Sequence, residues 1–277
     1  MTRRLPPQLN LGEVCNMALL QAHNALTELG SEGRESVSHD RLVDLTTQGD
    51  FGVAQRVIDF LRERHVPAIV YDEERGIVKL ADNPRYTIPL DDIDGTNNYK
   101  RGRSPYCTAI AICDGLEPRF RDVLVAGIIE HTSGDVWFAR KGDGAWLNGK
   151  PMKTSGMTQI QTPVEGGKLY RANVTVDMYL DGDAFPEIID SVWPADFCSG
   201  AYHLAGVSSG IFDAHITRNR KVDELAAGYL LVKEAGGFVS DLEGKPIDDV
   251  RIRPDTKYPI VAAATEPLAR ALLTMIR

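Results

Sequence analysis

The sequence predicts a mixed α/β fold, and three features of the chain indicate it. Apolar residues recur at helical spacing over 9–29 and again after Asp50, which predicts two amphipathic helices near the N-terminus. From 106 to 152, short apolar runs alternate with glycine turns, a pattern typical of antiparallel strands in a meander. The later part of the chain alternates strand-like and helix-like segments. The first half is therefore expected to be α+β and the second half to alternate α and β.

The length and composition are those of an ordinary globular protein. The chain has 277 residues, of which 43% are hydrophobic and 25% charged, enough for one large domain or two halves with a substantial core. It has no internal repeat, no low-complexity segment and no linker long enough to separate domains. We therefore expect one unit over 1–277, with approximate halves at 1–160 and 161–277.

The individual elements follow from periodicity and from turn residues. The first helix is expected to stop at Gly30, and the second follows Thr47, with Asp50 as a possible N-cap. Asn148-Gly149 is a strong hairpin signal. Strands are expected at 66–71, 86–90, 106–115, 123–132, within 134–152, and at 168–176, 211–217, 238–244 and 258–265. Further helices are expected at 184–193, after a strand and turn within 195–210, from Asp223 to Gly236-Gly237, and at 266–277.

Charge and cysteine usage narrow the class of protein. The net charge of −8 and the pI near 5.3 should repel nucleic acids and anionic membranes, so an anionic substrate would need a local basic cluster. The four cysteines have no CxxC or zinc-site spacing, which indicates buried free thiols in a reducing compartment. No stretch has the length of a signal peptide core or a membrane span. We expect a cytoplasmic protein without nucleic-acid or membrane partners.

The most informative stretch is RYTIPLDDIDGTNNYK, residues 85–100. A strand pattern ends in three carboxylates within four residues, Asp91, Asp92 and Asp94. Like charges at this spacing repel unless a cation lies among them, and hard divalent cations such as Mg²⁺ prefer oxygen ligands. Gly95-Thr96 then turns the chain in a way that can expose backbone N–H groups to a phosphate. Metal-assisted phosphoryl chemistry is one interpretation, and an acidic strand end with a helix cap is the other.

Carboxylates also stand at other ends of predicted elements. Glu73 and Glu74 follow the strand at 66–71, Asp223 opens a helix, and Asp50 stands close to Thr47. Each of these alone is more typical of a structural role, such as an N-cap. Their combination favours a shared site.

Three motifs together resemble those of the inositol monophosphatase and fructose-1,6-bisphosphatase superfamily of magnesium-dependent, lithium-sensitive phosphatases, and in particular its archaeal dual-activity branch. They are DEERG (72–76), DDIDGTNNY (91–99) and VDELAAGYLLVKEAGG (222–237). Weaker matches are TTQGD (46–50), KGDGAWLNGKPM (141–152) and SGAYHLAGVSSGIFDA (199–214).

The resemblance implies a layered αβαβα sandwich, a homodimer, and two or three Mg²⁺ ions per site, with Mn²⁺ as a possible substitute. It implies a metal- and phosphate-binding first half and a substrate-binding second half. The implied metal ligands are Glu73, Asp91, the carbonyl of Ile93, Asp94 and Asp223. Gly95 and Thr96 would hold the phosphate, and Asp50, Thr96 and Glu73 would activate the attacking water. The implied substrate-binding set comprises Ile93, Asp94, Gly95, Thr96, Ser199, Gly200, Arg218, Arg220 and Asp223.

The chain departs from the family pattern at several positions. Asp92 replaces the usual proline and Val222 the usual tryptophan. Ile216 stands where animal inositol monophosphatases have a glutamate that binds inositol hydroxyls, seven residues before Asp223.

A basic cluster, Arg218-Asn219-Arg220-Lys221, follows that position. It is either a solvated surface patch or a site where Arg218 or Arg220 binds a second phosphate. Ser199-Gly200 corresponds to a loop that contacts substrate in relatives, or is only the start of a helix.

These features predict a Mg²⁺-dependent phosphatase for a small sugar or polyol phosphate. Inositol 1-phosphate and fructose 1,6-bisphosphate are the leading substrates. Two alternatives are a catalytically silent relative that binds metal and phosphate as a regulator or scaffold, and a 3′,5′-bisphosphate nucleotidase.

Overall fold

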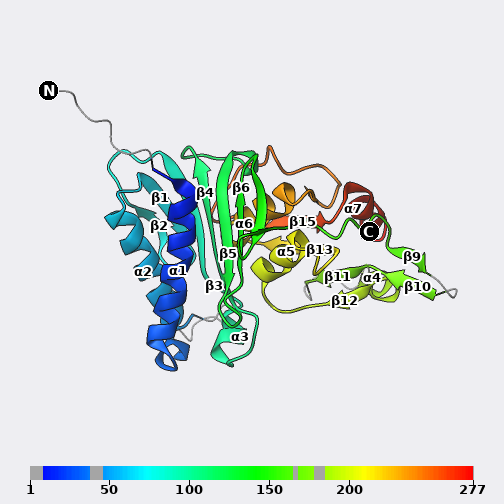
Figure 1. Ribbon diagram of the computed structural model, residues 1–277, viewed down its shortest axis with the longest axis horizontal. Helices are drawn as coiled ribbons and strands as arrows, with labels where there is room; N and C mark the ends of the chain where they lie inside the picture. The colour runs from blue at the N-terminus through cyan, green and yellow to red at the C-terminus, as the bar shows by residue number, and fades with distance from the viewer. Residues whose placement is uncertain (1–8, 38–45, 165–167, 178–184, 277) are drawn as a thin grey trace.

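The computed structural model describes residues 9–37, 46–164, 168–177 and 185–276, arranged in five layers (Figure 1). Helices α1 and α2 cover one face of an eight-stranded sheet, and α5 and α6 cover its other face. A five-stranded sheet follows, with α4 and α7 on its far side. The layered αβαβα sandwich expected from the sequence is therefore confirmed.

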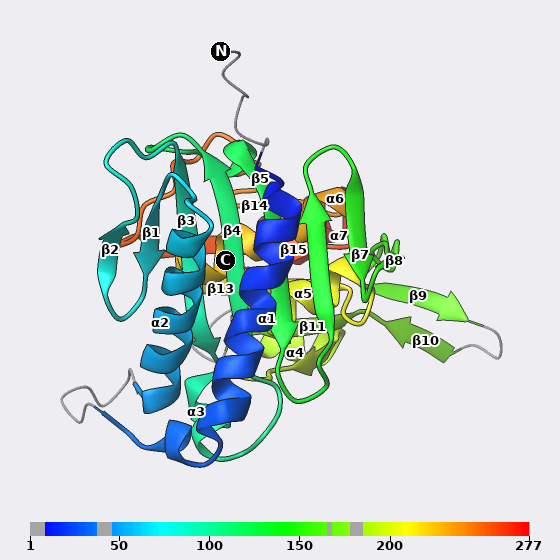
Figure 2. The same cartoon turned by 60° about the vertical axis from the view of Figure 1, so that its left-hand side comes forward.

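The two N-terminal helices run side by side across the first sheet (Figure 2). Helix α1 (Leu11–Leu29) begins where the Asn10 side chain accepts a hydrogen bond from the Glu13 amide, and it ends at Gly30 with a φ of 54°. Helix α2 (Gln48–Glu63) begins with a capping box between Thr47 and Asp50. Both helices bury one apolar face, as their periodicity predicts.

The first sheet has the strand order β2-β1-β3-β4-β5-β6-β7-β8. All neighbouring strands are antiparallel except β1 and β3, which are parallel because β2 forms a hairpin on the outer edge of β1. Asn148-Gly149 connects β7 to β8, which confirms the predicted hairpin. The strands are β1 (Ala68–Asp72), β2 (Gly76–Lys79), β3 (Tyr86–Asp94), β4 (Cys107–Asp114), β5 (Val123–Glu130), β6 (Val136–Arg140), β7 (Gly144–Leu147) and β8 (Lys150–Pro151). Short helices α3 (Thr96–Lys100), η1 (Glu32–Arg34) and η2 (Phe120–Asp122) connect elements of this half.

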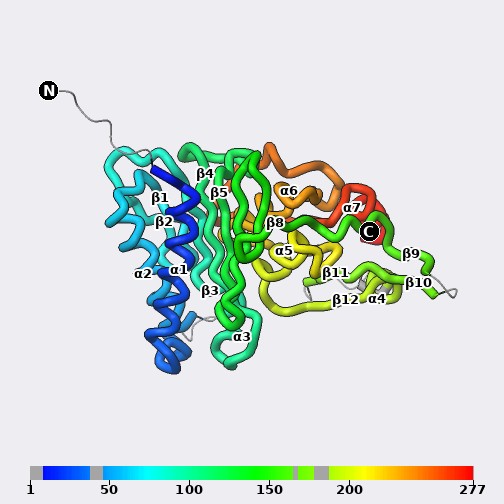
Figure 3. The backbone as a smooth tube through the Cα atoms, in the orientation of Figure 1, coloured from blue at the N-terminus to red at the C-terminus, as the bar shows by residue number. Residues whose placement is uncertain are grey.

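The second sheet has the order β12-β11-β13-β15-β14 and mixes parallel and antiparallel pairs. Its strands are β11 (Asn173–Val176), β12 (Trp193–Ala195), β13 (Ala214–Arg220), β14 (Phe238–Ser240) and β15 (Tyr258–Ala263). The helices of this half are α4 (Phe185–Ser191), α5 (Gly200–Ser208), α6 (Val222–Glu234) and α7 (Glu266–Leu273). Strands β9 (Gln161–Val164) and β10 (Lys168–Arg171) form a separate pair that projects from the body (Figure 3).

Three clusters of buried apolar side chains lie between the layers. One joins α1 and α2 to the first sheet and includes Leu19, Val57 and Ile88. The largest surrounds α5 and α6 between the two sheets, and the third lies between the second sheet and the helices α4 and α7. Because α6 is apolar on nearly all sides, it serves as the central layer of the sandwich.

The structure corrects some predicted boundaries. The segment 168–176, predicted as one strand, forms β10 and β11, which are interrupted at Ala172 and belong to different sheets. Strand β2 was not predicted, since its residues are mostly exposed and give no burial pattern. Three cysteines are buried free thiols as predicted, whereas Cys198 is exposed. Among the described residues, no helix has the length and apolar character needed to cross a membrane.

Candidate metal centre and active site

A β-bulge near the end of β3 aligns two carboxylates. Residues three apart on a regular strand point to opposite faces of the sheet. The pairing of β3 with β4 shifts between Asp91, opposite Ala109, and Asp94, opposite Cys107, so that β3 gains one residue over this interval. Both Asp91 and Asp94 consequently face the layer that contains α5 and α6.

Asp94 is fixed by the start of α5. Its carboxylate accepts hydrogen bonds from the Ser199 hydroxyl at 2.5 Å, the Ala201 amide at 2.7 Å and the Gly200 amide at 3.1 Å. Ser199 is also the N-cap of α5, where its Oγ accepts from the Tyr202 amide. Ser199-Gly200 is therefore a helix start, and it also contacts a residue of the expected site.

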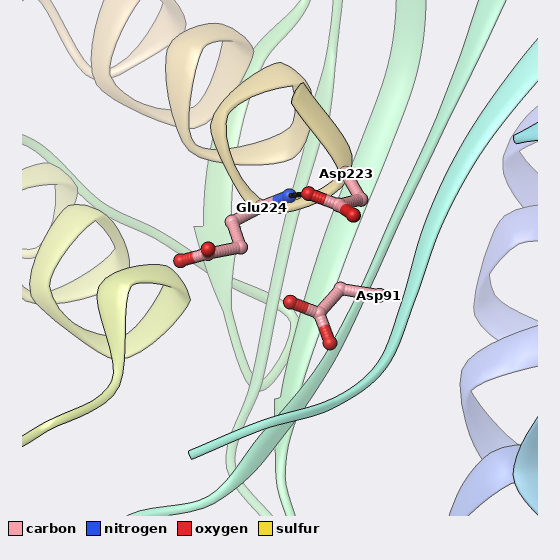
Figure 4. Close-up of side chains that lie close together, drawn as sticks. All are labelled: Asp91, Asp223 and Glu224. Atoms are coloured by element: carbon pink, nitrogen blue, oxygen red, sulfur yellow. Dashed lines mark hydrogen bonds between the residues drawn. The ribbon is translucent and has the colours of Figure 1, made fainter. Parts of the chain in front are cut away.

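Helix α6 brings two more carboxylates to Asp91. Asp223 and Glu224 lie in its first turn, where the helix dipole favours negative charge. Figure 4 shows both side chains gathered near Asp91, and one oxygen from each of the three carboxylates lies within 4.8 Å of the others. Within the described residues, this is the one group of three or more such side chains with metal-binding spacing. All three are buried.

Glu224 is the residue that the sequence analysis did not include. The signal was the spacing within VDELAAGYLLVKEAGG (222–237), which resembles the family pattern Asp-x-Ala-Ala-Gly. Counted back from Ala226-Ala227-Gly228, Glu224 and not Asp223 holds the acidic position of that motif. The structure places both Asp223 and Glu224 beside Asp91, so both residues can contribute to the same site.

The electrostatics of the cluster favour a bound cation. Burial, followed by repulsion from Glu73, Asp94 and Asp223, raises the pKa of Asp91 well above its usual value. Burial and Glu73 likewise raise the pKa of Asp223 to about 7. Asp91 Oδ1 is buried without a hydrogen-bond partner. Carboxylates that repel one another, with one oxygen of Asp91 left without a donor, fit a divalent cation such as Mg²⁺.

Two cations already contact the acidic site. The buried Arg220 guanidinium binds Glu224 through Nη1 at 2.5 Å and Asp177 through Nη2 at 2.8 Å. The Lys221 ammonium forms an ion pair with Glu73. Of the basic cluster, Arg220 is thus an interior residue that contacts two carboxylates, and no solvated patch forms at its position.

A cavity of about 290 Å³ opens beside the carboxylates. Its walls include Glu73, Lys221 and Asp223, and the loop that precedes β15 contributes Thr256 and Lys257. The side chains of Glu73 and Lys221 are 31% and 29% exposed. This side of the site is therefore open to solvent, whereas Asp91 and Glu224 are enclosed.

The expected water-orienting residues lie at the start of α2. Asp50 accepts hydrogen bonds from the Thr47 amide at 2.7 Å and the Thr47 hydroxyl at 2.6 Å. The Thr96 hydroxyl lies 2.8 Å from the Ile93 carbonyl and 3.4 Å from Asp50 Oδ1. Asp50 therefore has both a capping role and a contact with Thr96.

The turn after β3 requires glycine. Gly95 has a φ of 87°, and a Cβ there would lie 3.0 Å from the Pro105 carbonyl. The turn places Thr96 beside the Ile93 carbonyl and the start of α2. Ile216 is fully buried in the apolar core between the second sheet and α4 and α7. Counted back from Glu224, the position seven residues before the motif acid is Thr217, which is also buried, and not Ile216.

Asp92 lies on the opposite face of β3 from Asp91. It is buried, and neither carboxylate oxygen has a hydrogen-bond partner. Burial and the charge of Asp72 raise its pKa well above the usual value. Asp92, which stands where the family pattern has proline, is therefore neither exposed to solvent nor part of the cluster of Asp91, Asp223 and Glu224.

Comparison with known proteins identifies the family of the chain. The family model for the inositol monophosphatase family matches residues 11–275. The chain belongs to the inositol monophosphatase family. As a member of this family it is a metal-dependent phosphoric monoester hydrolase.

Relatives with assigned names share about a quarter to a third of their residues with the chain. It is 28% identical over 233 residues to a fructose-1,6-bisphosphatase/inositol-1-monophosphatase of Methanothermobacter thermautotrophicus, covering 80% of this chain and 77% of the relative. It is 31% identical over 198 residues to the Nus factor SuhB of Xylella fastidiosa, covering 69% and 67%.

Among solved structures, the suhB protein of Bartonella henselae has a TM-score of 0.81 at 22% identity, covering 97% of this chain and 99% of that chain. An inositol monophosphatase/NADP phosphatase solved with NADP and Ca²⁺ has a TM-score of 0.77 at 18% identity, covering 96% and 94%. Both solved structures therefore have the same fold as this chain.

Proposed function

We propose that this protein hydrolyses phosphate monoesters of small sugars or polyols in a Mg²⁺-dependent reaction. The observation that carries the proposal is the convergence of Asp91, Asp223 and Glu224 within 4.8 Å, next to Asp94 and the Gly95-Thr96 turn. Fructose 1,6-bisphosphate and inositol 1-phosphate are the leading substrates, because similar proteins carry both names. A silent binding role is less well supported, since every expected acidic ligand is present.

The proposed ligands of the metal ions are Glu73, Asp91, Asp94, Asp223, Glu224 and the carbonyl of Ile93. Bound there, Mg²⁺ would neutralise phosphoryl charge and lower the pKa of water. Asp94 is held in one orientation by three donors from α5, so it is pre-organised for this role.

Asp50 and Thr96 are proposed to orient the attacking water. The Asp50 carboxylate is fixed by Thr47 on one oxygen, and its other oxygen faces the Thr96 hydroxyl. Thr96 in turn contacts the Ile93 carbonyl. Because the Thr96 hydroxyl donates its one proton within the protein, a water that donates to the Thr96 oxygen or to Asp50 would be oriented towards a phosphate held at Gly95-Thr96.

Phosphate release from inositol 1-phosphate, fructose 1,6-bisphosphate, NADP and adenosine 3′,5′-bisphosphate tests the proposal. Each substrate is measured with Mg²⁺ and with a chelator. We expect release that depends on Mg²⁺ and is fastest with a sugar or polyol phosphate. Asp91→Asn should abolish it, while Asp59→Asn, on the half-exposed side of α2, serves as a control. Fastest release from a nucleotide would overturn the substrate class, and release in chelator would overturn the metal assignment.

A further inference from the structure

Two consecutive cations at the start of α6 contact different sides of the acidic site. Arg220 binds Glu224, which lies within 4.8 Å of Asp91 and Asp223. Lys221, the next residue, binds Glu73 on the open side. Their environments differ sharply. The Arg220 side chain is 9% exposed and touches two carboxylates, whereas the Lys221 side chain is 29% exposed and lines the 290 Å³ cavity.

We propose that Arg220 is a permanent internal cation that holds the metal site in its binding geometry, whereas Lys221 is an exchangeable cation that a metal ion displaces from Glu73. This inference rests on the proposed metal-dependent function. It gives two adjacent basic residues opposite effects on metal affinity. Arg220 is a positioning residue, because it acts through Glu224.

Contacts with three elements hold the Arg220 side chain in one position. Its two terminal nitrogens bind Glu224 from α6 and Asp177 from the end of β11, and Asp177 also accepts from the Thr217 hydroxyl. A Cβ on Gly200 would lie 1.9 Å from Arg220 Nη1, so the start of α5 packs directly on the guanidinium. A planar guanidinium can serve two carboxylates in fixed directions, which an ammonium does less well.

The position of Arg220 links the two sides of the site. Through Glu224 it reaches the Asp91 cluster, and through Gly200 it packs on the segment whose amides hold Asp94. Burial alone would lower the Arg220 pKa, but the charges of Glu224, Asp177 and Asp94 raise it above the usual value. The guanidinium therefore stays charged and compensates carboxylates on both β3 and α6.

Lys221 has the features of a cation that can leave. Its ammonium forms an ion pair with Glu73, and both side chains are about 30% exposed. An ion pair of this kind is worth little, because water replaces either partner readily. A divalent ion at Glu73 interacts more strongly with the carboxylate than a single ammonium does. Lys221 therefore competes with the metal ion, and the open cavity lets the lysine move aside.

Calorimetric measurement of Mg²⁺ binding to the full chain tests the inference without turnover. Lys221→Met should tighten Mg²⁺ binding by about two- to fivefold, the range that a partly exposed ion pair supports. Arg220→Lys, which keeps the charge but loses the planar fork, should weaken binding by about 10- to 100-fold, as loss of an outer partner of a ligand does. The exposed residues Lys150 and Arg85 supply matched controls, Lys150→Met and Arg85→Lys.

Asp177→Asn is a second variant that tests the positioning role of Arg220 if Arg220→Lys does not fold. It removes the ion pair between Asp177 and the Arg220 guanidinium and should also weaken Mg²⁺ binding, with an unchanged number of bound ions. Unchanged affinity in both Asp177→Asn and Arg220→Lys would overturn the positioning role. Unchanged or weaker Mg²⁺ binding in Lys221→Met would overturn the exchange role, and a raised KM in that variant would then assign Lys221 to substrate.

The same measurements separate this inference from the proposed function. Opposite shifts in Mg²⁺ affinity without phosphate release by the wild-type chain would support the inference and overturn the proposed reaction. Mg²⁺-dependent phosphate release by the wild-type chain, with the same Mg²⁺ affinity in all variants, would support the proposed reaction and overturn the inference.

Discussion

The Ser199 hydroxyl donates a 2.5 Å hydrogen bond to Asp94 across 105 residues of sequence. The contact joins the end of β3, in the first sheet, to the start of α5. Because Ser199 also caps α5, one side chain both starts a helix and orients a proposed metal ligand. The candidate site is thus assembled from both halves of the chain.

Ser199→Ala should weaken Mg²⁺ binding and destabilise the protein. The variant loses the α5 cap, which costs about 1 kcal/mol of unfolding free energy. It also frees Asp94, and loss of a ligand's outer partner lowers metal affinity by about 10-fold or more. Calorimetry and denaturant unfolding measure the two effects. Ser199→Thr keeps the hydroxyl and should restore much of both. Full Mg²⁺ affinity in Ser199→Ala would show that Asp94 does not depend on this contact.

Asp94→Asn should lower kcat by about 100-fold or more while the protein remains folded, since loss of a ligand exceeds loss of an outer partner. An asparagine offers one oxygen where the carboxylate accepts from Ser199, Gly200 and Ala201, so unfolding free energy should also fall. Phosphate release and circular dichroism check the prediction. Undiminished turnover would remove Asp94 from the metal site.

Gly200→Ala should break the Arg220–Glu224 ion pair. The added Cβ would lie 1.9 Å from Arg220 Nη1 and 2.3 Å from Glu224 Oε2, so the pair must move. Displacing a buried ion pair costs about 3–5 kcal/mol when one partner is left uncompensated. Thermal unfolding and Mg²⁺ titration report on both consequences. Ala205→Gly on the same helix tests for a general effect of helix propensity. Wild-type stability of Gly200→Ala would contradict the packing described here.

The stability of the metal-free protein should fall as pH rises from about 4 to 7. Burial, with added repulsion from Glu74 and Glu73, raises the pKa of Asp50 to about 7 against the hydrogen bonds from Thr47. The folded chain therefore holds a proton that the unfolded chain releases near pH 4. The contribution of Asp50 to the unfolding free energy then decreases by up to about 1.4 kcal/mol per pH unit between about pH 4 and 7.

Asp50→Asn should make this pH dependence less steep. Urea unfolding at several pH values gives the slope of the unfolding free energy against pH for each variant. A weaker α2 cap lowers the unfolding free energy equally at every pH, and so it does not change this slope. Asp59→Asn, on a half-exposed position of the same helix, should leave the slope unchanged. An identical slope in Asp50→Asn and the wild-type chain would show that Asp50 is ionised throughout.

Arg220→Lys should reduce hydrolysis of inositol 1-phosphate and fructose 1,6-bisphosphate by the same factor. Arg220 is committed to Glu224 and Asp177, and so the second-phosphate role that the basic cluster suggested does not suit it. The ratio of kcat/KM for the two substrates is the measurement. A selective loss on the bisphosphate would return Arg220 to substrate recognition. The same ratio in Arg218→Ala tests the remaining arginine of that prediction.

Local patterns in the sequence determined much of this protein. The helices α1 and α2, the strand that ends in Asp91 and Asp94, and the turn at Asn148-Gly149 all follow from periodicity and turn residues. The motifs also indicated the family, because several acids in a fixed order along a chain are a specific pattern. These features are encoded within windows of a few to about twenty residues, where backbone geometry fixes which side chains share a face.

How the acidic residues meet depends on contacts between elements that are far apart in the sequence. The bulge that turns Asp94 to the side of Asp91 depends on pairing with β4, and the alternation of a lone strand does not reveal it. The inward position of Arg220 depends on Asp177 and Glu224, since a buried guanidinium is stable only beside its partners. Sequence patterns identified Asp91 and Asp223 but not Glu224. Contacts between distant elements determined which carboxylates lie together and which of them already contact Arg220 or Lys221.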